Sequence, residues 1–132
     1  MGMAALRTIR SEKFRPAARN IAVVRQLADE LPEGCRDAAR VVLSELASNA
    51  VRHARTPFEV TVRMGDTVWI GVRDYSRRQP RLLFATPDDV SGRGLLLVSS
   101  LACRWGVDRR DRAKVVWAEL PLDDSARLVG AC

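Results

Sequence analysis

The sequence has no long apolar run and contains few cysteines, histidines, lysines and aromatic residues. No run approaches the roughly 20 apolar residues that cross a bilayer, and the N-terminus has no basic region followed by an apolar core. We therefore expect neither a membrane span nor a signal peptide. The three cysteines are widely spaced, and one histidine cannot complete a zinc site. This pattern predicts buried or incidental thiols in a reducing compartment, with the cytoplasm as the location.

The net charge of +6 suggests nucleic acid as a first candidate partner. Of the 22 basic residues, however, only Lys13 and Lys114 are lysines, and the arginines are scattered along the chain. Aromatic residues make up 5% of the sequence, so stacking on bases has little support. The composition therefore disfavours nucleic acid as a partner. Nucleic acid stays open as an alternative that predicts salt-sensitive DNA binding.

The pattern of apolar residues predicts the order strand, helix, helix, hairpin, loop, helix, hairpin. The chain has 132 residues and shows no internal repeat or linker, which favours one domain over residues 1–132. The expected elements are a strand at Leu6–Arg10, a helix from Pro16 to about Leu31, a helix at about Arg36–Arg55, strands at Phe58–Met64 and Val68–Arg73, a loop at Asp74–Val90, a helix at Leu95–Leu101, and strands at Arg104–Val107 and Val115–Leu120. Strands joined by tight turns are antiparallel. The fold class predicted is α/β (α+β), a two-layer sandwich whose mixed, mostly antiparallel sheet is covered on one face by helices.

A polar stripe on the second expected helix is the strongest functional signal. Glu45, Asn49 and His53 follow one another at steps of four residues and lie at the edge of the apolar face. A carboxylate can act as a base, and an amide oxygen is a suitable ligand for Mg²⁺. The spacing alone is equally compatible with an ordinary solvated stripe.

Two further features come later in the chain. Ser91–Gly94 precedes an apolar helix, and glycine amides at a helix N-terminus can bind phosphate. This Gly-x-Gly signal is weak, and a plain loop-to-helix turn explains it more simply. Asp74 ends a strand, where its carboxylate could accept a hydrogen bond from an adenine amino group. Aspartate is also common at strand ends and turns for structural reasons.

These features, in this order, resemble the GHKL ATP-binding fold of gyrase-type ATPases and histidine kinases. The most similar branch is that of the small bacterial anti-sigma-factor serine kinases and their actinobacterial relatives. Val42–Ala54 resembles the N-box of that branch, Val72–Ser76 occupies the place of its first glycine box, and Ser91–Leu95 resembles its second glycine box. The similarity extends from about residue 8 to about residue 122.

The resemblance implies a role for each candidate residue and implies ATP and Mg²⁺ as cofactors. Glu45 would be the catalytic carboxylate, Asn49 the Mg²⁺ ligand, His53 a supporting residue, Asp74 the adenine-binding residue, and Gly92, Arg93 and Gly94 the phosphate-binding residues. Glycine normally follows the aspartate of the first glycine box, but residues 75–80 contain none. This departure concerns affinity and turnover rather than the fold.

The resemblance also implies a function. The protein would bind a sigma factor and phosphorylate a serine on an anti-anti-sigma (STAS-type) partner, and a homodimer is expected. The alternative is a nucleotide- or partner-binding module of the same fold without kinase activity, which the missing glycines favour. A sensor histidine kinase fragment is disfavoured, because the chain lacks the two-helix segment that bears a phosphoaccepting histidine.

Overall fold

The computed structural model describes residues 5–76 and 90–123, with the backbone alone at 90–94. The elements are β1 (Arg7–Phe14), α1 (Arg19–Gln26), the 3₁₀ turn η1 (Leu27–Glu30), α2 (Glu33–Asn49), the π turn η2 (Ala50–Ala54), β2 (Phe58–Met64), β3 (Thr67–Asp74), α3 (Val90–Leu101), β4 (Arg104–Arg110) and β5 (Ala113–Pro121). None of the helices in these described ranges is both long and apolar enough to traverse a lipid bilayer.

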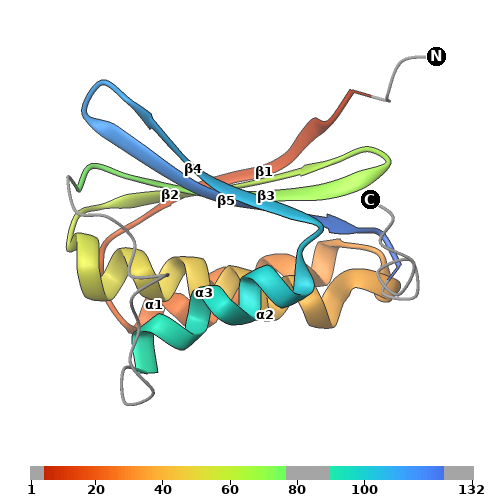
Figure 1. The fold of residues 1–132 in the computed structure, drawn as a ribbon, viewed down its shortest axis with the longest axis horizontal. Coiled ribbons are helices and arrows are strands. Elements are labelled where there is room, and N and C mark those ends of the chain that lie inside the picture. Colours follow the sequence, from red (N-terminus) through yellow and green to blue (C-terminus); the bar gives the residue numbers. More distant parts are fainter. Residues whose placement is uncertain (1–4, 77–89, 124–132) are drawn as a thin grey trace.

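The strands form one twisted sheet in the order β1-β2-β3-β5-β4. Every pairing between the described strands is antiparallel. The three helices lie together on one face of this sheet (Figure 1). The predicted two-layer α/β sandwich is therefore confirmed, and its sheet is antiparallel throughout the described strands.

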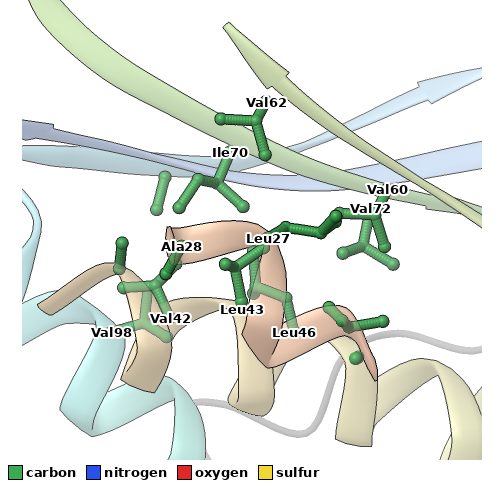
Figure 2. Packing of buried hydrophobic residues seen from close by; sticks show 14 of the residues in the cluster. Leu27, Ala28, Val42, Leu43, Leu46, Val60, Val62, Ile70, Val72 and Val98 are labelled. Atoms are coloured by element: carbon green, nitrogen blue, oxygen red, sulfur yellow. The ribbon is translucent and has the colours of Figure 1, made fainter. Parts of the chain in front are cut away.

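The core lies between the sheet and α2. Val60, Val62, Ile70 and Val72 of the hairpin β2–β3 point toward Leu43 and Leu46 of α2 (Figure 2). The strand residues are spaced by two and the helix residues by three, the periods that bring side chains to one face of each element. Fully burying one such side chain contributes about 1.5–3 kcal/mol, so this row of contacts fixes α2 against the sheet.

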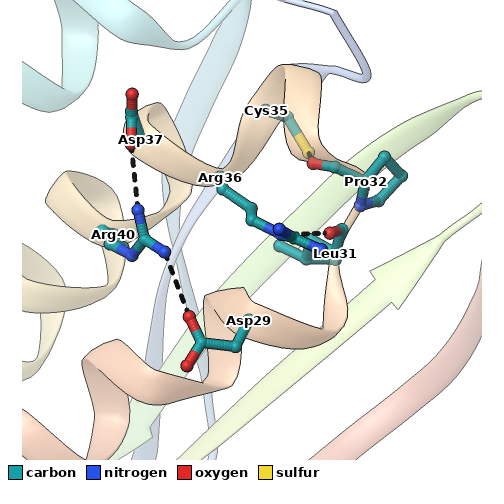
Figure 3. Close-up of polar contacts among 7 residues, drawn as sticks. All are labelled: Asp29, Leu31, Pro32, Cys35, Arg36, Asp37 and Arg40. Carbon is teal, nitrogen blue, oxygen red and sulfur yellow. Dashed lines mark hydrogen bonds and ion pairs between the residues drawn. The ribbon is translucent and has the colours of Figure 1, made fainter.

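The junction between η1 and α2 is held by polar contacts (Figure 3). The Arg40 guanidinium donates to Asp37 on its own helix at 2.9 Å and to Asp29 of η1 at 3.1 Å. Arg36 Nε donates to the carbonyl of Leu31 at 2.8 Å. These contacts, with the bond from Arg25 of α1 to Ser44, define the side of α2 that faces α1 and η1.

The observed element bounds differ from the predicted ones mainly at the ends. The first strand extends to Phe14, because its polar residues pair with β2 at an exposed edge. The first helix begins at Arg19 rather than Pro16, after a turn closed by the Asn20 side chain on the carbonyl of Arg15. The β4–β5 turn is also shorter than predicted, with Asp111 at φ 54°.

The cysteines follow the prediction only in part. Cys35 is a fully buried thiol that bonds the carbonyl of Pro32. Cys103 takes part in a disulfide, so the prediction of thiols alone is wrong for this residue.

Candidate functional site

Glu45 and Asn49 lie on the side of α2 that faces away from α1. At about 100° per residue they sit roughly 100° and 140° around the helix from Ser44, which bonds Arg25 of α1. Val42, seven residues before Asn49, shares its stripe and lies near Val98 of α3 (Figure 2). The Asn49 stripe is therefore directed toward the α3 side of the molecule.

The end of this helix is a π turn rather than a regular α-helix. The Arg55 amide donates to the carbonyl of Ala50 at 2.9 Å, and Arg55 itself has a left-handed φ of 56°. Because a π turn contains more residues per turn than an α-helix, His53 does not continue the stripe at the angle that the spacing predicted. His53 is half-buried on this turn. Such turns are frequent at functional sites.

Asn49 is the most informative residue of the stripe. Its exposed fraction is 8%, and its Nδ2 atom has no hydrogen-bond partner among the described residues. An unpaired buried polar group costs about 1–3 kcal/mol, so a native protein rarely keeps one without a reason. Turning the amide by 180° would place Oδ1 at the same position, and an amide oxygen is a ligand that Mg²⁺ accepts. Asn49 therefore fits the cation-binding role.

Glu45 lies one turn before Asn49 and is half-buried. It forms no hydrogen bond or ion pair with any residue in the described ranges. A carboxylate in this state can accept a proton from an incoming hydroxyl group, because neither of its oxygens is already held by a basic partner.

Asp74 lies at the last position of β3, as predicted, and is 3% exposed. Its Oδ1 atom accepts a hydrogen bond from the Ser76 amide at 2.8 Å. The next amide, that of Tyr75, donates to Thr56 Oγ1 at 3.1 Å, which ties this end of β3 to the segment after η2. The end of β3, where Asp74 is the last residue, and the C-terminal end of α2 therefore lie at the same end of the sandwich (Figure 1).

Lys114 is a buried neighbour of Asp74 that the sequence did not reveal. It faces Asp74 across the β3–β5 pairing, is 3% exposed, and places Nζ 3.6 Å from Asp74 Oδ2. Burial raises the pKa of Asp74, although Ser76 and Lys114 oppose this shift. Burial lowers the pKa of Lys114, although Asp74 opposes that shift. Burial thus disfavours the charged form of each group, and the opposite charge beside it favours that form.

Gly92, Arg93 and Gly94 lie inside α3, which begins at Val90. The prediction that they precede the helix as a loop is therefore wrong, because the helix starts five residues earlier than Leu95. The first-turn amides of a helix have no intrahelical acceptor, so a first turn can still present donors to an anion. The predicted loop after Ser76 lies outside the described residues up to residue 89.

A separate hollow lies on the open face of the sheet. It has a volume of about 510 Å³ and includes Arg63, Trp69 and Arg73 in its lining. The Trp69 ring stacks with Trp117 at 6.4 Å between centroids, and the Arg63 guanidinium lies 5.0 Å from the centroid of Trp69. The fold thus gathers aromatic and basic residues that are scattered in the sequence. None of the predicted site residues lines this hollow.

Comparison with known proteins adds one finding to this geometry. The family model described as "Histidine kinase-like ATPase domain" matches residues 8–120, which is most of the chain. No curated protein matches the chain. The matched range contains every candidate site residue, from Glu45 on α2 to Gly94 on α3.

Proposed function

The chain belongs to the family of histidine kinase-like ATPase domains, and on that basis we propose that it binds ATP with Mg²⁺ as a regulatory protein. In this proposal it acts in the manner of anti-sigma-factor serine kinases. It binds a sigma factor, phosphorylates a serine on an anti-anti-sigma, STAS-type partner, and forms a homodimer. The observation that carries the nucleotide part is the buried Nδ2 atom of Asn49 at the end of α2, which has no hydrogen-bond partner among the described residues.

The chain's own residues divide the work of holding the nucleotide. Asn49 would bind the Mg²⁺ through Oδ1, because a hard cation prefers an oxygen ligand. Asp74 would accept a hydrogen bond from the base amino group through its buried carboxylate. Backbone amides of the first turn of α3, around Gly92–Gly94, would donate to the phosphates.

Glu45 would serve the transfer step. Bound ATP supplies the phosphoryl group, and the partner protein supplies the serine hydroxyl. Glu45 is half-buried, so its carboxylate can be reached by a partner's side chain while remaining fixed on α2. It would accept the hydroxyl proton as the serine oxygen attacks the γ-phosphoryl group, whose bond to the β-phosphate oxygen breaks and leaves ADP. Positioning and charge neutralisation supply most of the catalysis in phosphoryl transfer.

Transfer of radiolabelled phosphate from ATP to a verified STAS-type binding partner tests the kinase activity. We expect transfer by the unmodified protein and its loss in Glu45→Ala. The matched control is Glu33→Ala, which removes a carboxylate from the exposed first turn of the same helix and should leave transfer unchanged. Absence of transfer to a partner that demonstrably binds would overturn the kinase part of the proposal.

The second candidate function is a nucleotide- or partner-binding module without kinase activity. Two observations favour it: residues 75–80 contain no glycine, and Lys114 already lies beside the carboxylate of Asp74. Calorimetry with Mg-ATP and with ADP separates the two functions. Binding without phosphate transfer supports the module, whereas failure to bind either nucleotide indicates a protein-interaction domain.

A further inference from the structure

Two hollows on the open face of the sheet adjoin and form one groove. Residues of β2, β3 and β5 line both the hollow of about 510 Å³ and a second hollow of about 150 Å³, and these shared residues are Arg63, Trp69, Arg73 and Val115. Because these strands are neighbours in the sheet, the groove crosses them. The described helices all lie on the other face of the sheet (Figure 1). The groove is therefore separate from the side where the nucleotide site is proposed.

A glycine leaves the floor of this groove bare. Gly71 lies between Trp69 and Arg73 on β3, and residues two apart on a strand share a face. A Cβ atom at Gly71 would lie 2.3 Å from the Trp69 ring, so the ring leans over the space that a side chain would fill. Trp69 and Arg73 therefore form the two sides of the groove on β3, one apolar and one charged.

Aromatic rings, rather than carboxylates, hold the two central guanidinium groups of the groove. The Arg63 guanidinium lies 5.0 Å from the centroid of the Trp69 ring, and that of Arg73 lies 5.8 Å from the centroid of the Tyr75 ring. Neither guanidinium forms a hydrogen bond or an ion pair with any residue of 5–76 or 95–123. Stacking on a ring orients a guanidinium and leaves its N–H groups able to donate to an anion.

The groove has its cations in the middle and its carboxylates at the ends. Arg63 and Arg73 line both hollows, so they lie where the hollows adjoin. The charged residues that line only one hollow are Glu59 at the smaller, and Asp108, Asp111 and Arg110 at the larger. A nucleic acid carries a negative charge at every phosphate and would meet these carboxylates. An acidic peptide can place its charges at the middle alone, so the arrangement favours a peptide.

We propose that the groove binds an extended acidic segment of a partner protein, with two consecutive acidic residues followed by an apolar one. Successive side chains of an extended chain point to opposite sides, so one carboxylate reaches Arg63 and the next reaches Arg73. The apolar side chain lies against Trp69 or Val115. Crossing from β2 to β4 takes about 14 Å, which about four extended residues span. The proposal does not depend on nucleotide binding.

Fluorescence anisotropy with a short labelled peptide tests the proposal. The peptide has two glutamates followed by a leucine at its centre, and its control has glutamines in place of the glutamates. We expect the acidic peptide to bind with a dissociation constant below about 1 mM and at least about tenfold more tightly than its control, because the control loses both charge-assisted contacts. Equal binding of the two peptides, or binding of neither, would overturn the proposal.

Substitutions then assign the binding to the groove. The double variant Arg63→Gln/Arg73→Gln should bind the acidic peptide at least about tenfold more weakly and leave Mg-ATP binding as it is in the unmodified protein. The matched control Arg15→Gln/Arg19→Gln removes the same charge from exposed residues that line neither hollow, and should keep peptide binding. Unchanged peptide binding by the first variant would overturn the proposal. If that variant does not fold, the two peptides with the unmodified protein still decide.

Two further measurements separate the other occupants of the groove. We expect a short labelled oligothymidylate to bind more weakly than the acidic peptide, and tighter binding would assign the groove to single-stranded nucleic acid and overturn the proposal. Sedimentation velocity should give the same oligomeric state for the unmodified protein and the double variant. A dimer that the double substitution dissociates would assign the groove to a second copy of this chain and would also overturn the proposal.

Discussion

The two ends of the row formed by β3 and β5 have opposite chemistry on the same backbone. One end pairs Val68 with Leu120, and both side chains are fully buried among apolar neighbours. The other end pairs Asp74 with Lys114 at nearly the same degree of burial. The first end gains stability from the removal of apolar surface from water, whereas the second pays a desolvation cost. The difference between the two pairs shows that the fold places a less stabilising, charged pair at one end of its core, and the nucleotide site is proposed at that end.

The largest effect is expected at the apolar end. Leu120→Ala should lower the free energy of unfolding by about 3 kcal/mol, because it removes buried methyl groups and leaves a cavity. Urea denaturation followed by circular dichroism measures this change. A loss below about 1 kcal/mol would mean that the apolar end does not anchor the sheet to the helices.

A double substitution at the charged end should cost less than a single one. Lys114→Met alone should cost about 2–3 kcal/mol at pH 7, because it leaves the carboxylate of Asp74 buried without its cation. Adding Asp74→Asn removes that charge, and we expect stability within about 1 kcal/mol of the unmodified protein. Urea denaturation of the three proteins gives the comparison. A double variant as unstable as Lys114→Met would show that the pair stabilises the fold and would remove the contrast between the two ends.

A smaller effect should appear in the pH dependence of stability. Burial raises the pKa of Asp74, so its contribution to stability is present below the ordinary value of 3.8 and is lost as pH rises through the folded-state pKa. Burial lowers the pKa of Lys114, so its contribution is present above 10.5 and is lost as pH falls through the folded-state pKa. Relative to the double variant, the unmodified protein should therefore be least stable near neutral pH. If the unmodified protein were instead most stable relative to the double variant near pH 7, the attribution of these pKa shifts to burial of Asp74 and Lys114 would be wrong.

The smallest effect on stability is expected at the open face of the sheet. A Cβ atom added at Gly71 would lie 2.3 Å from the Trp69 ring, so the ring must move. Because Trp69 is half-buried and faces the open side, Gly71→Ala should cost about 1 kcal/mol or less and leave nucleotide binding unchanged. Tryptophan fluorescence and the urea midpoint measure both consequences. Loss of ATP binding in this variant would place the nucleotide on the open face instead.

Much of the fold could be predicted from the sequence, because its signals are local. The alternation of apolar and polar residues in Phe58–Met64 predicts β2 with its observed bounds, and the apolar stripe of α2 predicts the helix that covers the sheet. The start of α3 was predicted too late, because Gly92 and Gly94 each disfavour a helix by about 1 kcal/mol.

From the sequence, the candidate site could be predicted only for residues whose position in a single helix or strand is itself the signal. Asn49 and Asp74 are candidates because of their places on a helix and at a strand end, and their roles stay predictions. Lys114 was missed because its partner is set by the register between β3 and β5, which no local pattern reports. The pairing of Trp69 with Trp117 depends on the same register and was missed for the same reason.

Calorimetric titration with Mg-ATP of the unmodified protein and of Asn49→Ala tests the central claim most directly. Because Nδ2 of Asn49 has no hydrogen-bond partner among the described residues, Asn49→Ala removes no hydrogen bond at this atom, and we expect the variant to fold with little change in its melting temperature. We predict saturable, Mg²⁺-dependent ATP binding by the unmodified protein and at least a tenfold loss of affinity in the variant. No binding by the unmodified protein, or equal binding by both proteins, would contradict the account.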